Sequence, residues 1–311
     1  MNALRPAVFT ADNLADGWWL GDPVNRSFRD FLLYSGSRFP SVLVGFAGRP
    51  GLAEVADGVA AGISQAGLNV FLAETATPIS ALTQAVGQRS MPLGLYLDEA
   101  PDGLSYTLLA VGNHGGPITE ADLPEVPPSP LGKLGVIGTT DLATPYLNGL
   151  RSLLDPSPDP HPRVSRLDHP FPHFEKKFGE RAEYRLFTER LPDGPIATIS
   201  PDGQSLRFAF PGGEPWTTRA MAERIGHYLT RVRRTSGTII GAKGVDLLPV
   251  EAGSQIRVEG GPLEYSSRAS FVDLLIGWWE PGIIAHQGFG PFGDAFLTLA
   301  YLLEAMGEGG V

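Results

Sequence analysis

Short apolar runs alternate with segments of helical spacing in the first half of the chain. Ser41 to Gly45 is a β-branched apolar run, and Leu52 to Ala66 follows with apolar residues at helical spacing before Gly67 ends it. A helix opens at Pro78 and runs to about Val86, and the remaining apolar runs are Leu68 to Ala73, Leu93 to Leu97 and Tyr106 to Val111. This alternation predicts an α/β fold, with a mixed or parallel sheet that carries helices on both faces.

Composition narrows the class of protein. A chain of 311 residues with 42% hydrophobic and 19% charged residues is long enough for two or three domains. The net charge of -10 disfavours nucleic acids and anionic membranes as partners, because both attract basic surfaces. The chain has no cysteine, which excludes disulfides, thiolate catalysis and cysteine-ligated zinc.

The chain offers no sign of export or membrane insertion. Residues 1–6 form no apolar signal region, and no apolar run approaches the length that spans a bilayer. We therefore expect a cytoplasmic protein with no membrane partner.

Two stretches rich in proline and serine, residues 124–130 and 155–162, read as stiff linkers. Asp141 to Leu154 between them predicts one helix, with Asp141 as its N-cap. The later elements expected are helices near Phe171 to Ala182, Thr218 to Arg231 and Asp294 to Met306, and strands at Tyr184 to Thr188, Ile196 to Ser200, Thr238 to Ala242 and Leu274 to Gly277.

Several motifs occur in the same order as in one enzyme family. The segment from Pro195 to Phe208 resembles a strand that ends in an Asp-x-Asp-x-Asp-Arg loop, and Ile276 to Ile283 resembles a Gly-Gly-Glu-Glu-Ser-Gly-Gly loop. Shorter matches are Val44 to Arg49, Gly67 to Val70, Thr75 to Pro78 and Gly115 to Ile118. Across residues 40–306 the sequence resembles the phosphohexomutases, the phosphoglucomutase/phosphomannomutase family.

The resemblance implies tandem α/β/α domains with mixed sheets. Residues 1–128 would be like domain I, residues 129–198 like an abbreviated domain II, and residues 199–311 like domain III. The family's fourth, C-terminal domain, which grips the distal phosphate of the substrate, has no counterpart in this sequence.

In the resembling loop, three alternating carboxylates would hold Mg²⁺. Here the three positions are Ser200, Asp202 and Gln204, and Ser205 stands in place of the arginine. A single carboxylate is a poor Mg²⁺ site, because this ion needs several oxygen ligands and gives up water reluctantly. We expect no cofactor, and Mg²⁺ only if this degraded loop still binds it.

The family's nucleophile is a serine that carries phosphate in a Thr-Ala-Ser-His-Asn-Pro loop. Ala100 falls at that position, and an alanine cannot be phosphorylated. Ser105 is the nearest alternative but has no base next to it in the sequence, and His114 lies in a turn where polar residues are common. The resemblance and these departures together predict a protein without mutase activity.

Five residues are candidates for ligand binding: Arg49, Trp278, Trp279, Glu280 and Gly282. The last four lie in the segment that resembles the sugar-selecting loop. Because neighbouring residues at a strand end point in opposite directions, we expect one of Trp278 and Trp279 to be buried and the other to face a cleft. The alternative is that the exposed ring has no role and that one member of each pair, Trp278 and Trp279 or Trp18 and Trp19, simply belongs to the core, as strand alternation requires.

Three classes of function remain open. The chain could be an inactive relative that acts as a structural or regulatory partner, through a protein partner or a homodimer formed by its first domain. It could bind a sugar or sugar phosphate. As an enzyme it would be a divergent phosphosugar mutase of carbohydrate metabolism, or would use a new cluster of Asp98, Glu99, Asp102 and Asp202.

Overall fold

The computed structural model describes residues 8–11, 41–65, 67–100, 103, 105–113, 115–118, 133–154, 163–179, 184–251, 253–258, 274–287, 289 and 292–307. Both expected linkers and the pair Trp18 and Trp19 lie outside these ranges. The chain divides into two compact units, Met1–Pro145 and Tyr146–Val311. The division into three domains stays a prediction.

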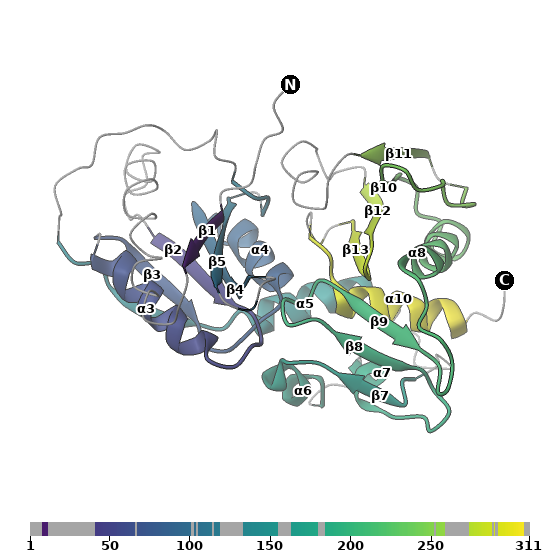
Figure 1. The fold of residues 1–311 in the computed structure, drawn as a ribbon, viewed down its shortest axis with the longest axis horizontal. Coiled ribbons are helices and arrows are strands. Elements are labelled where there is room, and N and C mark those ends of the chain that lie inside the picture. Colours follow the sequence, from purple (N-terminus) through teal and green to yellow (C-terminus); the bar gives the residue numbers. More distant parts are fainter. Residues whose placement is uncertain are drawn as a thin grey trace. The chain divides into compact units, whose positions relative to one another are not determined.

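A mixed sheet of six strands forms the centre of the first unit (Figure 1). Its order is β1-β5-β4-β2-β3-β6. Strands β2, β3, β4 and β6 run parallel, whereas β5 is antiparallel to both β4 and β1. The strands are β1 (Val8–Ala11), β2 (Ser41–Phe46), β3 (Asn69–Ala73), β4 (Leu93–Glu99), β5 (Tyr106–Gly112) and β6 (Ile137–Thr140). The mixed sheet expected from the sequence is confirmed.

Helices α3 (Leu52–Gln65) and α4 (Ile79–Gln88) connect the parallel strands. The connection from β2 to β3 and the connection from β3 to β4 cross the sheet in opposite directions. Right-handed crossovers therefore place the two helices on opposite faces. All six residues of β2 are buried, as this arrangement requires.

Helix α4 lies very close to its strands because two residues beneath it are glycines. A Cβ atom added at Gly94 would lie 2.5 Å from Cγ2 of Val86, and one at Gly45 would lie 3.4 Å from Cδ1 of Leu82. Any side chain at Gly94 would thus push the helix away from the sheet.

Helix α5 (Ala143–Leu153) begins where the sequence predicts. Oδ1 of Asp141 accepts hydrogen bonds from the N–H groups of Ala143, at 2.8 Å, and Thr144, at 3.0 Å. This aspartate thus caps the helix, and both the helix and its N-cap are confirmed.

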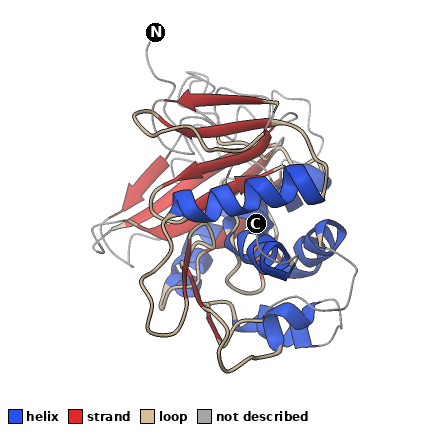
Figure 2. Ribbon diagram, turned by 90° about the vertical axis from the view of Figure 1, so that its right-hand side faces the viewer, coloured by secondary structure: helices blue, strands red, loops and turns tan. Residues whose placement is uncertain are grey.

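The second unit contains a three-stranded and a four-stranded sheet, with the orders β7-β8-β9 and β11-β10-β12-β13. Strands and helices are distinguished by colour in Figure 2. The strands are β7 (Arg166–Asp168), β8 (Ile196–Ile199), β9 (Leu206–Ala209), β10 (Thr238–Ala242), β11 (Ser254–Val258), β12 (Leu274–Trp279) and β13 (Ile283–His286). The helices are α6 (Pro172–Gly179), α7 (Arg185–Thr188), α8 (Thr218–His227), η4 (Tyr228–Val232) and α10 (Ala295–Gly307).

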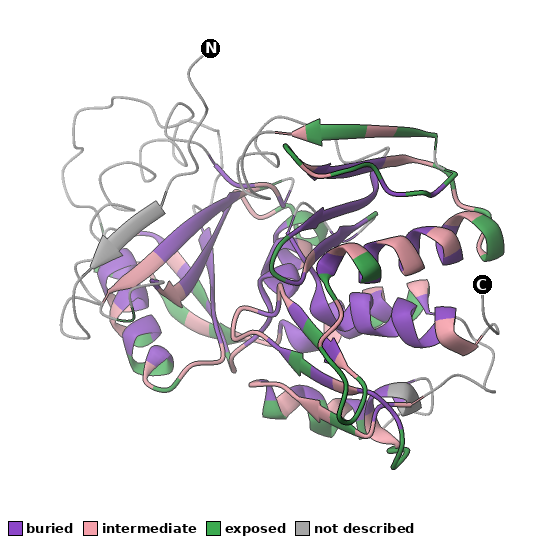
Figure 3. Cartoon of the chain, turned by 45° about the vertical axis from the view of Figure 1, so that its right-hand side comes forward, coloured by how far each residue is buried: buried purple, intermediate pink, exposed green. Residues whose placement is uncertain are grey.

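Helix α10 forms the core of the second unit, and Figure 3 shows it almost entirely buried. It packs against β8, β9, β13 and α8. The ring of Phe296 lies 5.7 Å from that of Phe174, 5.4 Å from that of Phe178 and 5.8 Å from that of Phe187, between centroids. An apolar helix surrounded on all sides is the expected result for a segment with so few polar residues.

The strand expected at Tyr184 to Thr188 is wrong, because the segment forms one turn and the short helix α7. Tyr184 and Phe187 are buried and lie three residues apart, which places both on one side of a helix. Both rings contact Phe178 of α6, with centroid distances of 5.3 and 4.7 Å. Packing against this ring selects the helical conformation.

The helix expected from Thr218 to Arg231 is present, but its last turn widens. Helix α8 ends at His227, and residues Tyr228–Val232 continue as the π-helix η4. In the part of the chain that the structure covers, no helix is both long and apolar enough to cross a membrane.

His286 is a buried titratable residue between β13 and α10. Its Nε2 atom lies 2.8 Å from Oγ1 of Thr298, and its ring meets that of Tyr301 edge to face. Complete burial lowers the pKa of His286 to about 3, because the charged imidazolium cannot be hydrated there. The folded protein therefore holds this imidazole neutral.

We predict that this histidine makes the protein less stable in mild acid. The unfolded chain takes up a proton below the ordinary pKa of 6.5, whereas the folded chain takes it up only near 3. Stability is thus full above pH 6.5 and falls as the pH decreases toward 3, by at most about 1.4 kcal/mol per pH unit. Urea unfolding from pH 7 to 4 measures this slope, and His286→Gln should reduce it by up to one proton. An unchanged slope in the variant would contradict the assignment.

Candidate functional site

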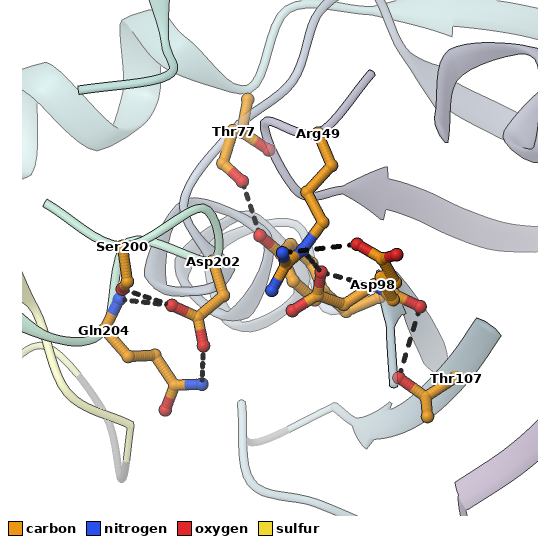
Figure 4. Close-up of polar contacts among 9 residues, drawn as sticks. Arg49, Thr77, Asp98, Thr107, Ser200, Asp202 and Gln204 are labelled. Atoms are coloured by element: carbon orange, nitrogen blue, oxygen red, sulfur yellow. Dashed lines mark hydrogen bonds and ion pairs between the residues drawn. The ribbon is translucent and has the colours of Figure 1, made fainter. Parts of the chain in front are cut away.

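The carboxyl ends of β2 and β4 form the first candidate site. These adjacent strands lie where the helical connections reverse direction, which is the position where open α/β sheets bind ligands. Nε of Arg49 lies 2.8 Å from Oδ1 of Asp98, and its NH1 atom lies 3.3 Å from Oε2 of Glu99 (Figure 4). Arg49, a predicted ligand-binding residue, is thus held by the last two residues of β4.

A tight hairpin turn occupies the position where the resemblance expects the nucleophile loop. The N–H of Ala100 donates to the carbonyl of Ser105 at 2.7 Å, and the N–H of Gly103 donates to the carbonyl of Ala100 at 2.9 Å. Gly103 has a φ of 66°, which favours glycine. Ala100 is buried, and its methyl group offers no chemistry. Asp102 and His114 lie outside the described residues.

The second candidate site is the loop between β8 and β9, where the carboxylate of Asp202 accepts three hydrogen bonds. Its Oδ1 atom accepts from the hydroxyl of Ser200 and, at 3.0 Å, from the backbone N–H of Gln204. Its Oδ2 atom accepts from the side-chain amide of Gln204 at 2.8 Å (Figure 4). Ser200 and Gln204, which stand where the resemblance expects carboxylates, therefore both bind Asp202.

The backbone closes the same loop. The N–H of Gly203 donates to the carbonyl of Ser200 at 2.9 Å, and the N–H of Ser205 donates to the hydroxyl of Ser200, also at 2.9 Å. Among the described residues, no group of three or more His, Cys, Asp or Glu side chains could hold a metal ion. The donors around Asp202 stabilise its charge without a cation.

We predict that Mg²⁺ at millimolar concentration does not raise the melting temperature of this protein. A metal that binds only the folded state must stabilise it, so a thermal shift assay detects such binding. Mg²⁺ would have to displace the three donors from Asp202 and would find no second carboxylate in the loop.

Two variants control this experiment. The double substitution Ser200→Asp with Gln204→Asp restores the three carboxylates, and it should produce a Mg²⁺-dependent stabilisation if the loop keeps its shape. A Mg²⁺-dependent shift in the unaltered protein that disappears in Asp202→Asn would contradict the prediction.

Glu280 and Gly282, two more predicted ligand residues, lie in the turn between β12 and β13. The hydroxyl of the buried Thr218 donates to Oε2 of Glu280 and accepts from the N–H of Gly282 at 2.6 Å. Glu280 itself is exposed. Thr218 thus fixes one carboxylate oxygen at the surface of the second unit. Sequence reasoning did not assign this role to Thr218. The two adjacent threonines at the helix start were the available signal, and the first of them, Thr217, is the N-cap of α8.

The expectation that one of Trp278 and Trp279 faces a cleft is wrong, because both are buried, with 3% and 4% exposure. Both belong to β12, which lies between β10 and β13 and is buried on both faces. The ring of Trp279 covers Gly277, where an added Cβ would lie 2.6 Å from it. The ring of Trp278 covers Gly241 of the neighbouring strand in the same way. The glycines make room for these rings in the core.

Asp294, the first residue of the helix expected from the sequence, caps α10. Its Oδ1 atom accepts from the N–H of Leu297 at 2.8 Å, and both carboxylate oxygens lie 3.0 Å from the hydroxyl of Tyr146. The residue is completely buried. Its position is therefore that of a structural cap.

The second unit brings three of these segments together. The N–H of Leu206 donates to the carbonyl of Gly282 at 3.0 Å, and the N–H of Ala295 donates to the carbonyl of Gly203 at 2.9 Å. The Asp202 loop, the Glu280 turn and the start of α10 thus form one connected edge. Arg49 and Ala100 belong to the first unit and form a site of their own.

Comparison with known proteins gives matches in structure. No protein-family model matches the sequence, and no curated protein matches it in sequence. A protein of Thermus thermophilus described as a phosphomannomutase is similar in structure, with a TM-score of 0.75 and 19% identity, over 98% of this chain and 80% of that protein.

Two further structures are similar. A phosphoglucomutase/phosphomannomutase family protein from Burkholderia thailandensis matches with a TM-score of 0.67 and 12% identity, over 98% of this chain and 77% of its own. The open form of parafusin, a phosphoglucomutase from Paramecium, matches with a TM-score of 0.67 and 10% identity, over 98% of this chain and 73% of its own. The protein therefore has the fold of the phosphohexomutases, as its sequence predicts.

Proposed function

We propose that this protein binds a sugar or a sugar phosphate and does not transfer phosphate. The hairpin at Ala100 is the observation that supports the absence of phosphate transfer. In a phosphohexomutase-like fold, this position is the one where the resemblance expects the phosphorylated serine, and phosphoryl transfer through the enzyme needs such a nucleophile. The nearest serine in the sequence is Ser105, whose backbone carbonyl accepts a hydrogen bond from Ala100 within the same turn.

The exposed polar groups at the strand ends support the binding half of the proposal. Glu280 presents a carboxylate that can accept hydrogen bonds from sugar hydroxyls, and Thr218 holds it in place. In the first unit, Arg49 provides a partly exposed guanidinium at the carboxyl edge of the six-stranded sheet. Its ion pairs engage Asp98 and Glu99, so the alternative enzyme with a new carboxylate cluster has less support.

The first test is activity. We predict that the purified protein does not interconvert the 1- and 6-phosphates of glucose or mannose, with Mg²⁺ and a bisphosphate activator present. If turnover appears and Ser105→Ala abolishes it, then Ser105 is the nucleophile and the proposal of inactivity is wrong. Turnover that persists in Ser105→Ala would instead show that Ala100 does not mark the catalytic position.

Binding is tested on the same protein by calorimetric titration with glucose, glucose 1-phosphate and glucose 6-phosphate. Glu280→Gln should weaken binding about tenfold, because a charge-assisted hydrogen bond is lost. Glu214→Gln is the matched control, since Glu214 is also exposed but lies in the turn after β9. If no sugar or sugar phosphate binds, this function is excluded.

A second candidate is a structural or regulatory partner, which an exposed apolar edge of the first sheet favours. Leu134, Val136 and Ile137 are 73%, 69% and 46% exposed, and Phe71 of the neighbouring strand is 40% exposed. Ile137 begins β6, and Leu134 and Val136 directly precede it. In the described residues, β6 pairs only with β3. An edge strand with apolar side chains is a ready surface for another chain.

We predict that this edge associates with a second copy of the protein. Sedimentation should then reveal a dimer whose dissociation constant rises at least about tenfold in Val136→Lys, because a charge is placed in the apolar contact. Leu247→Lys is the control, since Leu247 is an exposed leucine of the second unit. A monomer at all concentrations, or equal effects of the two substitutions, would argue against this role.

A further inference from the structure

Strand β6 forms one edge of the six-stranded sheet, and its outer side is unpaired in the described residues. The carbonyls of Val136 and Thr140 accept hydrogen bonds from β3 and from the residue after it, at 2.8 and 3.1 Å, so both carbonyls point toward β3. Successive residues of a strand direct their backbone groups to opposite sides. The N–H and C=O groups of Ile137 and Thr139 therefore point away from the sheet.

The edge strand carries none of the features that commonly prevent pairing with another chain. Such edges are protected by charged side chains, prolines or bulges. The segment from Leu134 to Thr140 contains no charged residue and no proline, and β6 pairs with β3 in one regular register. Among the described residues, a Cβ atom added at Gly138 meets no atom within 4 Å, apart from those of its chain neighbours. Strand β6 is thus open to a second strand.

A second copy of the chain is the partner that this edge favours. The net charge of -10 makes two copies repel each other over much of their surface. The uncharged segment from Leu134 to Thr140 adds no repulsion where two copies meet. A strand edge is also complementary to itself, because two antiparallel copies related by a two-fold axis present the same donors and acceptors to each other.

The backbone decides the register of such a pair. With the two-fold axis beside Gly138, Ile137 of one copy lies opposite Thr139 of the other, and the two residues exchange both hydrogen bonds. An axis at Ile137 would place Thr139 opposite Gly135, whose N–H already donates to a carbonyl of α3 at 2.8 Å. An axis at Thr139 would place Ile137 opposite Asp141, whose carbonyl already accepts from a guanidinium at 3.2 Å. Of these three registers, the one centred on Gly138 displaces no existing hydrogen bond.

We propose that two copies of the protein join their six-stranded sheets into one continuous sheet, through antiparallel pairing of β6 about a two-fold axis beside Gly138. Ile137 and Thr139 of each copy supply the backbone hydrogen bonds. The exposed Val136 then lies opposite Thr140 of the second copy and is covered by the contact. This inference rests on the second candidate function above, which names the surface but not how two copies meet there.

Disulfide formation tests the register, because the chain has no cysteine of its own. In the proposed arrangement the two Gly138 residues form a non-hydrogen-bonded pair, with Cα atoms about 4.5 Å apart. A disulfide bridges Cα distances of about 4.4–6.8 Å, so Gly138→Cys should oxidise to a covalent dimer. Gly87→Cys is the matched control, because Gly87 is also a glycine of the first unit where an added Cβ meets no atom within 4 Å.

The expected difference between the two cysteine variants is large. Cross-linking should be at least about tenfold faster in Gly138→Cys than in Gly87→Cys, because pairing raises the effective concentration of the two thiols. The rate is measured by electrophoresis without reductant, at a protein concentration where sedimentation detects the dimer.

Hydrogen exchange tests the same pairing on the unaltered protein. The amide protons of Ile137 and Thr139 should exchange at least about tenfold more slowly above the dissociation constant of the dimer than below it, because pairing protects them. The amide of Gly138 points toward β3 and should be protected at every concentration. This measurement decides the question alone if Gly138→Cys does not fold.

The outcomes separate this inference from the function on which it rests. A protein that is monomeric at all concentrations excludes the association and the strand pairing with it. A dimer that Val136→Lys weakens, but in which the two cysteine variants cross-link equally and the outward amides of β6 stay unprotected, would retain the association and reject the strand pairing. Protected amides without faster cross-linking would reject the register, and faster cross-linking without protected amides would reject the backbone pairing.

Discussion

Hydrogen bonding of polar groups that are withdrawn from water governs how the loops of this protein are built. Such groups are costly unless they find partners, and three loops in the second unit meet this requirement internally. Asp202 is bound by Ser200 and Gln204, Thr218 joins Glu280 to Gly282, and Asp294 caps α10 and accepts from Tyr146. The outer edge of β6 is different, because its backbone groups have no partners among the described residues.

The same constraint accounts for the shape of two loops in this phosphohexomutase-like fold. Three carboxylates in one loop repel each other and need a cation, whereas Ser200 and Gln204 supply donors that stabilise the single remaining carboxylate. At the other strand end, the turn at Ala100 closes through backbone hydrogen bonds. Both loops thus satisfy their polar groups with the residues present.

Much of the fold could be predicted from sequence because its longer elements carry strong local patterns. The helical spacing from Leu52 and the apolar run at Ser41 specify α3 and β2, and Asp141 marks the start of α5. The short strands β6, β7, β11 and β13 have only three to five residues each, and alternation over so few positions is too weak to identify them. The segment Tyr184 to Thr188 has the apolar content of a strand, but its conformation depends on packing against Phe178, which local propensity does not include.

For the candidate sites, the sequence by itself determined which chemical groups exist: Ala100 has no hydroxyl, and one carboxylate remains at the loop of Asp202. Only the tertiary structure decided what those groups contact. Trp278 and Trp279 have the sequence pattern of one buried and one exposed ring, but their burial depends on the strands on either side and on the glycines beneath the rings. The outer edge of β6, unpaired in the described residues, was equally invisible, because a missing neighbour is a property of the surrounding space, and residue order alone does not specify it.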